Sequence, residues 1–263
     1  MESETSFEPI LSVQDLNVKI GEKRILQNIN LTAYKGRVLG IIGESGSGKS
    51  MLCQAIMQAL PTFAQKGSGK ILYNQHDLSI LSEEKMRAVR GKQISMIMQN
   101  PSASLDSIQT IEMHFRETLK AHFPMTKKEI TQTAIYYMRK VNLPNPEKLL
   151  TYYPFQLSGG MLQRVMIALS LSMQSKLFIA DEPTTALDTV NQKNILSLFD
   201  RIRTETGATI IIVTHDLGVI AELADDVAVM YKGEIVEQTN VYDYFDNPQH
   251  PYTKKLLQSR IIV

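Results

Sequence analysis

The residues best suited to chemistry form the segment 43–50, whose letters are GESGSGKS. Glycines let a backbone wrap closely around phosphate oxygens, and the free amides of a helix N-terminus attract an anion. In this pattern Lys49 reaches the β- and γ-phosphates of a nucleotide, and the hydroxyl of Ser50 is a ligand for Mg²⁺. We therefore assign phosphate binding to Gly43, Glu44, Ser45, Gly46, Ser47, Gly48, Lys49 and Ser50.

The alternative is a turn rich in glycine and serine that binds nothing. The apolar run at 38–42 precedes the segment and a helical pattern follows at 49–60. A strand, this loop and a helix in succession are the context in which the pattern binds phosphate. The sequence therefore predicts nucleotide binding.

Two adjacent carboxylates follow another apolar run, at 177–180. At the end of a buried strand, Asp181 is placed to hold Mg²⁺. Glu182 comes directly after it and can polarise an attacking water, so we assign it as the general base. Alone, the pair also fits a solvated turn before Pro183, but the phosphate loop makes that interpretation much weaker.

The elements that must position these residues form repeated strand–turn–helix units. The runs at 38–42, 177–180 and 210–213 are apolar without alternation, as strands covered on both faces are. Helical patterns follow them at 49–60, 189–204 and 217–224. Such units predict a parallel sheet with functional groups at the carboxyl ends of its strands.

Other segments differ from these units. Apolar and polar residues alternate within 10–18 and 25–32, which favours an N-terminal antiparallel layer. Helical periodicity at 111–122 and 127–141, with no buried strand between, predicts an inserted helical region. Near the C-terminus we expect a hairpin of 227–231 with 234–238, then a helix near 253–259.

Composition limits the possible functions. The chain has 263 residues, with 28 Lys+Arg against 27 Asp+Glu, so the sequence carries no strongly basic nucleic-acid footprint and we expect no nucleic-acid partner. Its single cysteine, Cys53, gives no sign of an oxidising compartment. No run is long enough to span a membrane, and Met1–Ile10 is acidic, unlike a secretory signal. We expect a cytoplasmic protein whose membrane role comes through partners.

In combination, the motifs resemble those of the ATP-binding cassette (ABC) family. The segment 157–164, LSGGMLQR, looks like that family's signature loop, and it stands just before the strand with the two carboxylates. Gln99, Asp188 and His215 match further family motifs in the family's order. The resemblance covers essentially the whole chain.

The resemblance implies roles for these residues. Glu182, His215 and Gln99 would be catalytic, with His215 sensing the γ-phosphate. Ser50, Gln99 and Asp181 would hold Mg²⁺, and ATP would be the nucleotide. A helix-like run at 161–173 follows the signature, so Ser158, Gly159 and Gly160 would offer a hydroxyl, amides and a positive helix end to the γ-phosphate of ATP on an opposing subunit. Asp188 would link the two sites.

The implied fold class is α/β, a phosphate-loop NTPase with a mixed sheet core, an N-terminal antiparallel β layer and an inserted α-helical subdomain. We expect one ABC domain over 1–263. Its RecA-like core would cover about 1–100 and 165–240, its helical subdomain about 101–164, and its C-terminal tail about 241–263. A groove near 99–115 would receive a short helix from a membrane subunit, although Met96, Met98, Met113 and Phe115 fit core packing equally well.

Two features narrow the subfamily. The tail at 247–257, NPQHPYTKKLL, resembles that of peptide and nickel importers, and the signature with Met161-Leu162 is most like nickel-import subunits. We expect an ATPase for uptake of nickel or a related metal chelate, or alternatively of di- or oligopeptides. Expected partners are a second, different cassette, two membrane permeases and, indirectly, an extracytoplasmic solute-binding protein, at the cytoplasmic face of the membrane.

Some alternatives and one departure remain. The DNA-repair and translation types of cassette need longer chains, and a regulatory type with degenerate catalysis conflicts with the catalytic set. With Cys53 alone, no iron–sulfur cluster is expected. No metal cargo should bind this subunit, because the five histidines show no ligand-like spacing with Cys or paired acids. Where the family stacks adenine on an aromatic ring, 18–21 has none, and Ile20 offers only an apolar face. The segment 18–21 therefore gives no sign of selectivity for adenine over other bases.

Overall fold

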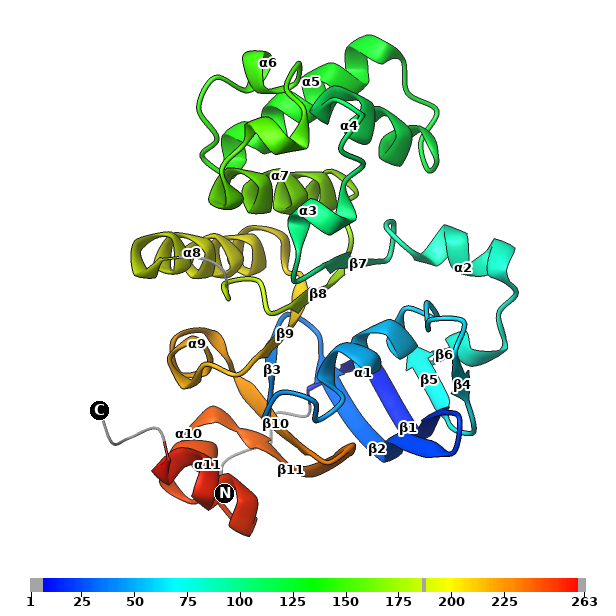
Figure 1. Cartoon of the computed structure of the whole chain (residues 1–263), viewed down its shortest axis with the longest axis vertical. Coiled ribbons are helices and arrows are strands. Elements are labelled where there is room, and N and C mark those ends of the chain that lie inside the picture. The colour runs from blue at the N-terminus through cyan, green and yellow to red at the C-terminus, as the bar shows by residue number, and fades with distance from the viewer. Residues whose placement is uncertain (1–6, 186–187, 260–263) are drawn as a thin grey trace. The chain divides into compact units, whose positions relative to one another are not determined.

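The computed structural model describes residues 7–185 and 188–259, and these divide into two compact units. The first unit combines 1–86 with 200–263, and the second is 87–199. Figure 1 shows the elements of each. The first unit holds the strands flanking the phosphate loop, whereas the second holds the two carboxylates and the signature segment.

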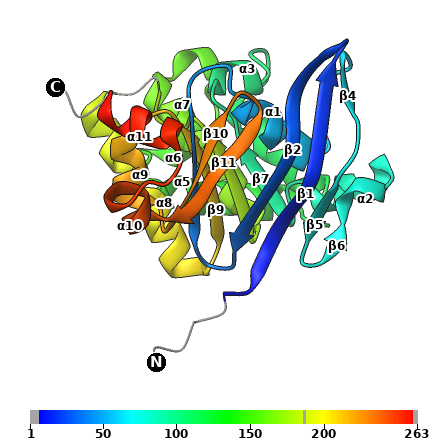
Figure 2. The ribbon, with the colours of Figure 1, turned by 90° about the horizontal axis from the view of Figure 1, so that it is seen from below.

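An antiparallel layer opens the first unit. Its long strands β1 and β2 pair from Pro9↔Tyr34 to Ile20↔Lys23 and form the blue hairpin of Figure 2. The layer runs in the order β2-β1-β5-β6, with β4 paired to β1. The alternating pattern of the sequence predicted this layer. In the structure, inward residues such as Leu16 and Val18 are fully buried, as such a layer requires. Its strands are β1 Pro9–Ile20, β2 Lys23–Tyr34, β4 Ala64–Lys66, β5 Lys70–Tyr73 and β6 His76–Asp77.

A mixed set of strands completes the first unit. The order is β11-β10-β3-β9, with β10–β3 and β3–β9 parallel and β10–β11 antiparallel. Both β3 and β9 are buried along their whole length, as their unbroken apolar letters predict. The strands are β3 Val38–Ile42, β9 Thr209–Thr214, β10 Asp226–Tyr231 and β11 Glu234–Asn240.

Short helices connect and cover these strands. They are α1 Lys49–Ile56, the 3₁₀ turn η1 Leu78–Ile80, α2 Glu83–Val89, α9 Leu217–Leu223, α10 Val241–Asp246 and α11 Pro251–Gln258. Helices α9, α10 and α11 share one buried apolar cluster with β3 and β10, which includes Ile42, Val229, Tyr244 and Leu256. The C-terminal helices, red in Figure 2, are therefore part of the core of this unit.

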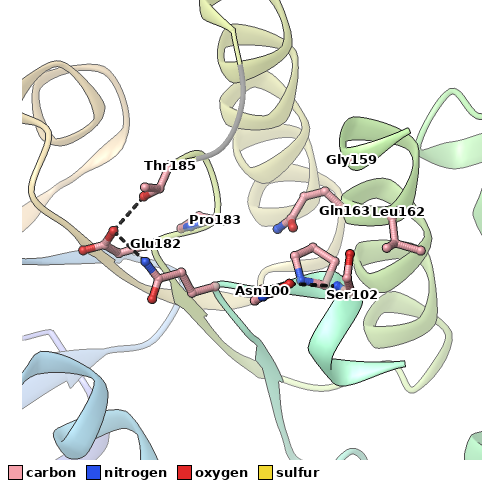
Figure 3. Close-up of a pocket in the computed structure, with 10 residues that line it drawn as sticks. Asn100, Ser102, Gly159, Leu162, Gln163, Glu182, Pro183 and Thr185 are labelled. Atoms are coloured by element: carbon pink, nitrogen blue, oxygen red, sulfur yellow. Dashed lines mark hydrogen bonds between the residues drawn. The ribbon is translucent and has the colours of Figure 1, made fainter. Parts of the chain in front are cut away.

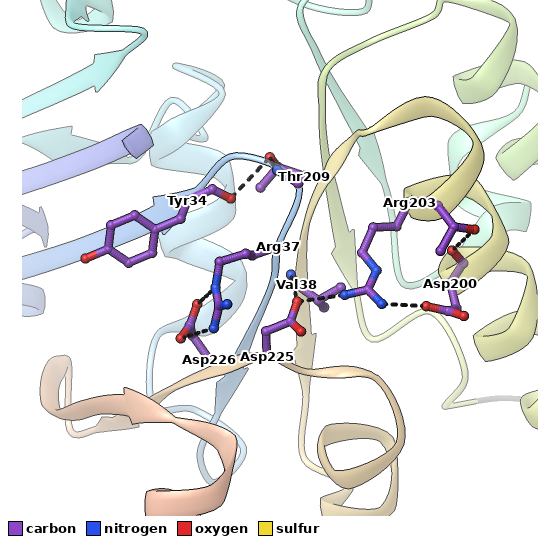
Figure 4. Close-up of polar contacts among 10 residues, drawn as sticks. Tyr34, Arg37, Val38, Asp200, Arg203, Thr209, Asp225 and Asp226 are labelled. Carbon is purple, nitrogen blue, oxygen red and sulfur yellow. Dashed lines mark hydrogen bonds and ion pairs between the residues drawn. The ribbon is translucent and has the colours of Figure 1, made fainter. Parts of the chain in front are cut away.

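A polar cluster fixes the amino ends of these strands (Figure 4). The guanidinium of Arg37 donates to both carboxylate oxygens of Asp226, over 2.7 and 2.8 Å. The neighbouring Asp225 accepts from the amide of Val38 and from Arg203, each over 2.8 Å. Charge-assisted, two-pronged contacts of this kind are directional. They lock the start of β3 to the start of β10, at the end opposite the phosphate loop.

The second unit is a parallel strand pair with a helical region. Strand β7 Ile94–Ile97 pairs with β8 Leu177–Asp181. Helix α5 packs on α4 and α7 through buried residues that include Phe115, Ile130 and Met138. The helices are α3 Pro101–Ser104, α4 Ile111–Lys120, α5 Lys127–Lys140, α6 Pro146–Leu149, the 3₁₀ turn η2 Pro154–Gln156, α7 Gly159–Ser172 and the start of α8 Thr189–Thr206.

The α/β fold class with its antiparallel layer, mixed strands and helical region is confirmed. The expected domain boundaries at 101 and 164 stay predictions, and the second unit also contains β7 and β8. One helix was predicted too long. Helix α1 ends at Ile56 rather than near residue 60, because Gln58 takes a left-handed φ of 50°.

Candidate functional site

The phosphate loop begins where β3 ends. A Cβ at Gly43 would lie 2.1 Å from the carbonyl oxygen of Met230, so only glycine fits this close approach. Gly48 has φ of 109° and caps α1 without any side-chain hydrogen bond. The first amides of α1 are therefore not capped by a side chain, which is the arrangement that binds an anion.

Lys49 and Ser47 turn their polar atoms toward the loop. Lys49 is only 5% exposed, and its ammonium donates to the carbonyl oxygens of Gly43 and Glu44 over 2.8 and 2.9 Å. The buried hydroxyl of Ser47 has no hydrogen-bond partner among the described residues. A buried polar group of this kind is costly unless a ligand or water satisfies it. Both features fit a bound phosphate.

The loop and His215 lie at the same edge of the first unit's strands. Strand β3 pairs in parallel with β9, and Ile42 stands opposite Thr214. Gly43 and His215 therefore follow two paired residues, at the carboxyl ends of neighbouring strands. His215 is half-buried there. This register supports the expectation that His215 lies at the nucleotide edge.

The second unit brings Gln99 to Glu182 through the same kind of register (Figure 3). In the parallel pair β7–β8, Ile97 stands opposite Ala180, so Gln99 and Glu182 come two residues after paired positions. The amide of Gln99 donates to Oε2 of Glu182 over 3.2 Å, and the hydroxyl of Thr185 donates to the same oxygen over 2.7 Å. Asp181 is buried at the end of β8. Two of the three predicted catalytic residues, Gln99 and Glu182, are thus in direct contact.

The conformation of Glu182 is unusual. Its φ is 46°, a left-handed value that a non-glycine residue adopts at some energetic cost. The hydrogen bonds from Gln99 and Thr185 hold the carboxylate of Glu182 in place. Sequence reasoning missed Thr185, because a threonine after Glu-Pro-Thr has no distinctive pattern. The structure adds it as a residue that orients the carboxylate.

The signature segment starts a helix, as predicted. Ser158 caps α7, and its hydroxyl accepts from the amide of Met161 over 3.3 Å, so its hydrogen can be donated elsewhere. Around an added Cβ at Gly159 there is no atom within 4 Å. Ser158 and Gly159 are both exposed. A 14-residue helix with an exposed N-terminus supports an anion-binding role.

A cavity of about 420 Å³ lies within the second unit (Figure 3). It is lined by Gln99, Asn100, Pro101, Ser102, Gly159, Leu162, Gln163, Glu182, Pro183 and Thr185. Gly159, at the start of the signature helix, and Glu182, the predicted general base, therefore line one cavity. Phe115 is core rather than groove, since it is fully buried, while Met98 is 43% exposed.

Asp188 caps helix α8. Its carboxylate accepts from the backbone amide of Asn191 over 3.0 Å and from the side-chain amide over 2.6 Å, and these bonds lower its pKa. It is fully exposed. The matching motif residues Ala186 and Leu187 lie outside the described residues.

The predicted residues fall into two groups. The loop 43–50 and His215 belong to the first unit, and Gln99, 158–160, Asp181, Glu182 and Asp188 belong to the second. The predicted Mg²⁺ donors are the exposed hydroxyl of Ser50, the amide of Gln99 and the carboxylate of Asp181. Oxygen donors of these kinds are those that Mg²⁺ prefers, so the residues fit the ion.

Comparisons with known proteins identify the class. The family "ABC transporter" matches residues 26–185. Two solved cassettes share the fold. MJ0796, in a dimeric post-hydrolysis state bound to ADP and Pi, has a TM-score of 0.78 and 25% identity over 88% of this chain and 98% of its own. For cbiO1 from Clostridium perfringens the TM-score is 0.77, with 28% identity over 97% of each chain.

The curated relatives place the chain more narrowly. It is 44% identical to the dipeptide transport ATP-binding protein DppD of Bacillus subtilis, over 96% of this chain and 77% of the relative. It is 42% identical to the metal-staphylopine import system ATP-binding protein CntD of Staphylococcus aureus, over 91% of this chain and 88% of the relative. The chain belongs to the ABC transporter family as an ATPase, in its peptide and nickel importer subfamily.

Across residues 7–185 and 188–259, no helix is long and apolar enough to cross a membrane.

Proposed function

We propose that residues of this chain carry out ATP hydrolysis in the roles expected from the sequence. The loop 43–50 binds the triphosphate, with Lys49 on its β- and γ-phosphates. Ser50, Asp181 and Gln99 hold Mg²⁺, which neutralises charge that develops on the phosphates. Glu182 takes a proton from the attacking water, and His215 donates to the γ-phosphate.

The observation that carries the catalytic assignment is the Gln99–Glu182–Thr185 contact. A general base works only if its carboxylate is aimed at the water, and two donors on one oxygen fix the direction in which the carboxylate of Glu182 faces. They also couple Glu182 to the segment that follows β7. A conformational change at the groove near 99–115 would then move the carboxylate of Glu182.

We further propose that the exposed signature of this chain caps ATP held by a second cassette. Ser158 and Gly159 are exposed and start a 14-residue helix, so they can meet a phosphate that this chain does not itself hold. The partner's signature would complete the site at Lys49 in the same way. ATP would then bridge two cassettes, and hydrolysis would release them.

The membrane partner of the proposed importer would dock on the second unit. Ile108 and Phe155 are 81% and 74% exposed, and Phe155 stacks on Tyr153 at 5.5 Å between ring centroids. Exposed apolar side chains that adjoin one another, as the rings of Tyr153 and Phe155 do, mark interaction sites. We propose that two permease subunits hold the chain at the cytoplasmic face of the membrane, and that a second, different cassette completes the complex.

For the cargo, we propose di- or oligopeptides. DppD of Bacillus subtilis is named for dipeptides at 44% identity, and OppD of the same organism is named for oligopeptides at 43%. The second candidate is nickel or a related metal chelate, which CntD supports at 42% identity. The sequence placed nickel first, and the names of these relatives favour peptides.

Uptake by proteoliposomes tests this proposal. They would contain the chain with candidate permeases, a candidate second cassette and a candidate solute-binding protein from the same organism. ATP-dependent accumulation of a labelled dipeptide, abolished by Glu182→Gln, is expected. Accumulation of a ⁶³Ni²⁺ chelate instead would transfer the assignment to the second candidate. Assembly without uptake of either cargo would contradict the importer function.

A further inference from the structure

We propose that Tyr252, on the C-terminal helix α11, is a positioning residue that holds the phosphate loop in its binding conformation. The hydroxyl oxygen of Tyr252 accepts a hydrogen bond of 3.1 Å from the backbone amide of Glu44, the second residue of the loop. The two residues are 208 positions apart in the chain. The inference rests on the assignment of 43–50 as the ATP phosphate site.

Glu44 is the residue through which a tether would act on the loop. Its carbonyl oxygen accepts from the ammonium of Lys49 over 2.9 Å and from the amide of Ser47 over 3.2 Å. The second of these bonds closes a turn inside the loop. Fixing the amide of Glu44 therefore also fixes the carbonyl that orients Lys49 and closes this turn.

Tyr252 is itself held rigidly. Its ring stacks on Tyr231, at the end of β10, with 4.0 Å between the centroids and 26° between the planes. It is 7% exposed and belongs to the apolar cluster that contains Ile42 and Leu256. Ile42 is the last residue of β3 and directly precedes the loop. The same apolar cluster therefore supports both β3 and the side chain of Tyr252.

Glu237, on β11, fixes the start of helix α11. One carboxylate oxygen accepts from the backbone amide of Gln249 over 2.8 Å. The other accepts from the amide of His250 over 2.9 Å and from the hydroxyl of Thr253 over 2.6 Å. Three donors on one carboxylate fix the orientation of the first turn of α11 relative to β11. They therefore also fix the position of Tyr252, which lies in that turn.

The same C-terminal segment, 226–258, makes a second contact with the loop. In the turn between β10 and β11, the amide of Gly233 donates to the carbonyl oxygen of Ser47 over 2.9 Å. Gly233 has φ of 87°, and a Cβ there would lie 2.4 Å from the carbonyl of Ile25, so this turn is tightly constrained. Glu44 and Ser47, the two ends of the turn inside the loop, are thus both tethered. A loop ordered in advance loses less entropy when it binds its ligand.

Equilibrium binding of Mg²⁺-ATP to the purified chain tests the proposal. Tyr252→Phe keeps the ring and removes the hydroxyl, so we expect the dissociation constant to rise about three- to tenfold with a melting temperature within a few degrees of wild type. Tyr231→Phe is the matched control, because it removes a hydroxyl from the other ring of the same stack. It should leave the dissociation constant unchanged. In the assembled transporter, Tyr252→Phe should raise KM for ATP while kcat stays constant.

Two more variants separate the possible outcomes. Lys49→Ala must weaken ATP binding strongly, and if it does not, the phosphate-site assignment itself fails. If Lys49→Ala weakens binding but Tyr252→Phe does not, only the positioning role is overturned. Glu237→Gln should weaken ATP binding and lower stability. Because it acts through Tyr252, its effect on binding should be less than additive with that of Tyr252→Phe, and full additivity would contradict the inferred route.

Discussion

At the residue scale, the proposed hydrolysis depends on the carboxylate of Glu182 and on the two donors that hold it. Glu182 adopts a left-handed backbone conformation and accepts hydrogen bonds from Gln99 and Thr185. The proposal therefore separates a residue that does chemistry from residues that orient it. Substitutions at the two kinds of residue should have different kinetic effects.

Glu182→Gln should keep ATP binding and lower the hydrolysis rate by at least about 100-fold, because an amide cannot take a proton from water. The measurement is phosphate release at saturating Mg²⁺-ATP together with equilibrium ATP binding. Glu222→Gln, which changes an exposed carboxylate on α9, is the control and should leave both unchanged. Turnover of the Glu182 variant near the wild-type rate would refute its assignment as the base.

Thr185→Val removes the hydroxyl that donates to Glu182 over 2.7 Å and preserves the size of the side chain. We expect kcat to fall about three- to thirtyfold with KM for ATP nearly constant, since the lost hydrogen bond is to a charged group. Thr185→Ser retains the hydroxyl and should recover most of kcat. Equal kcat values for the valine and serine variants would show that the contact has no part in catalysis.

At the element scale, the strands that lead to the phosphate loop at one end are held together by an ion pair at the other end. The Arg37–Asp226 pair joins the starts of β3 and β10, and both side chains are largely buried. The bonds lie far from the phosphate loop along β3, so breaking them should affect stability before affecting nucleotide contacts.

Arg37→Ala should lower the free energy of unfolding by about 2–4 kcal/mol, because it leaves the carboxylate of Asp226 buried without its partner. Lys35→Ala, which breaks the exposed pair with Glu8, should change it by less than about 1 kcal/mol. Urea unfolding of both variants gives the comparison. Equal losses would show that burial of the Arg37 pair has no energetic consequence.

The contact of Glu237 with α11 predicts a dependence on pH. Partial burial raises the pKa of Glu237, but the hydrogen bonds from Thr253, Gln249 and His250, together with the charge of His250, outweigh this effect. The pKa of Glu237 therefore lies below the ordinary value of a glutamate. A lowered carboxylate pKa contributes stability above the unfolded value, and that stability is lost as pH falls through the folded pKa. The melting-temperature gap between wild type and Glu237→Gln should therefore be full near pH 7 and shrink below about pH 4.5. A gap that is constant down to acid pH would contradict this.

Sequence reasoning succeeded where the determinants are local. The loop 43–50 and the capped start of α7 at Ser158 are set by consecutive residues, and β3 and β9 by unbroken apolar letters. It missed short strands such as β5 and β7, whose four residues are too few for a clear period. It also missed the contact of Tyr252 with Glu44, because pairing across 208 positions leaves no sign in either segment. It missed the contact of Thr185 with Glu182, three positions away, because a threonine there has no distinctive pattern.

At the scale of the whole molecule, the chain presents a phosphate loop in one unit and an exposed signature in the other. The proposed ATP hydrolysis needs two cassettes, because the signature segment of each would bind the ATP held by its partner. The matched cassette MJ0796 is itself described as dimeric with ADP and Pi bound. The proposal therefore predicts where a γ-phosphate-anchored label will attach.

The most direct measurement is photolabelling of the assembled transporter with a γ-phosphate-linked azidoanilide of ATP, followed by peptide mapping of this chain. Label is expected on the peptide that contains Ser158–Gly160, and Lys49→Ala in this chain should leave that label in place, because the nucleotide belongs to the partner's loop. Gel filtration confirms that the variant still assembles. Loss of the Ser158–Gly160 label in an assembled Lys49→Ala complex would show that the signature serves its own loop, and would contradict the two-cassette site.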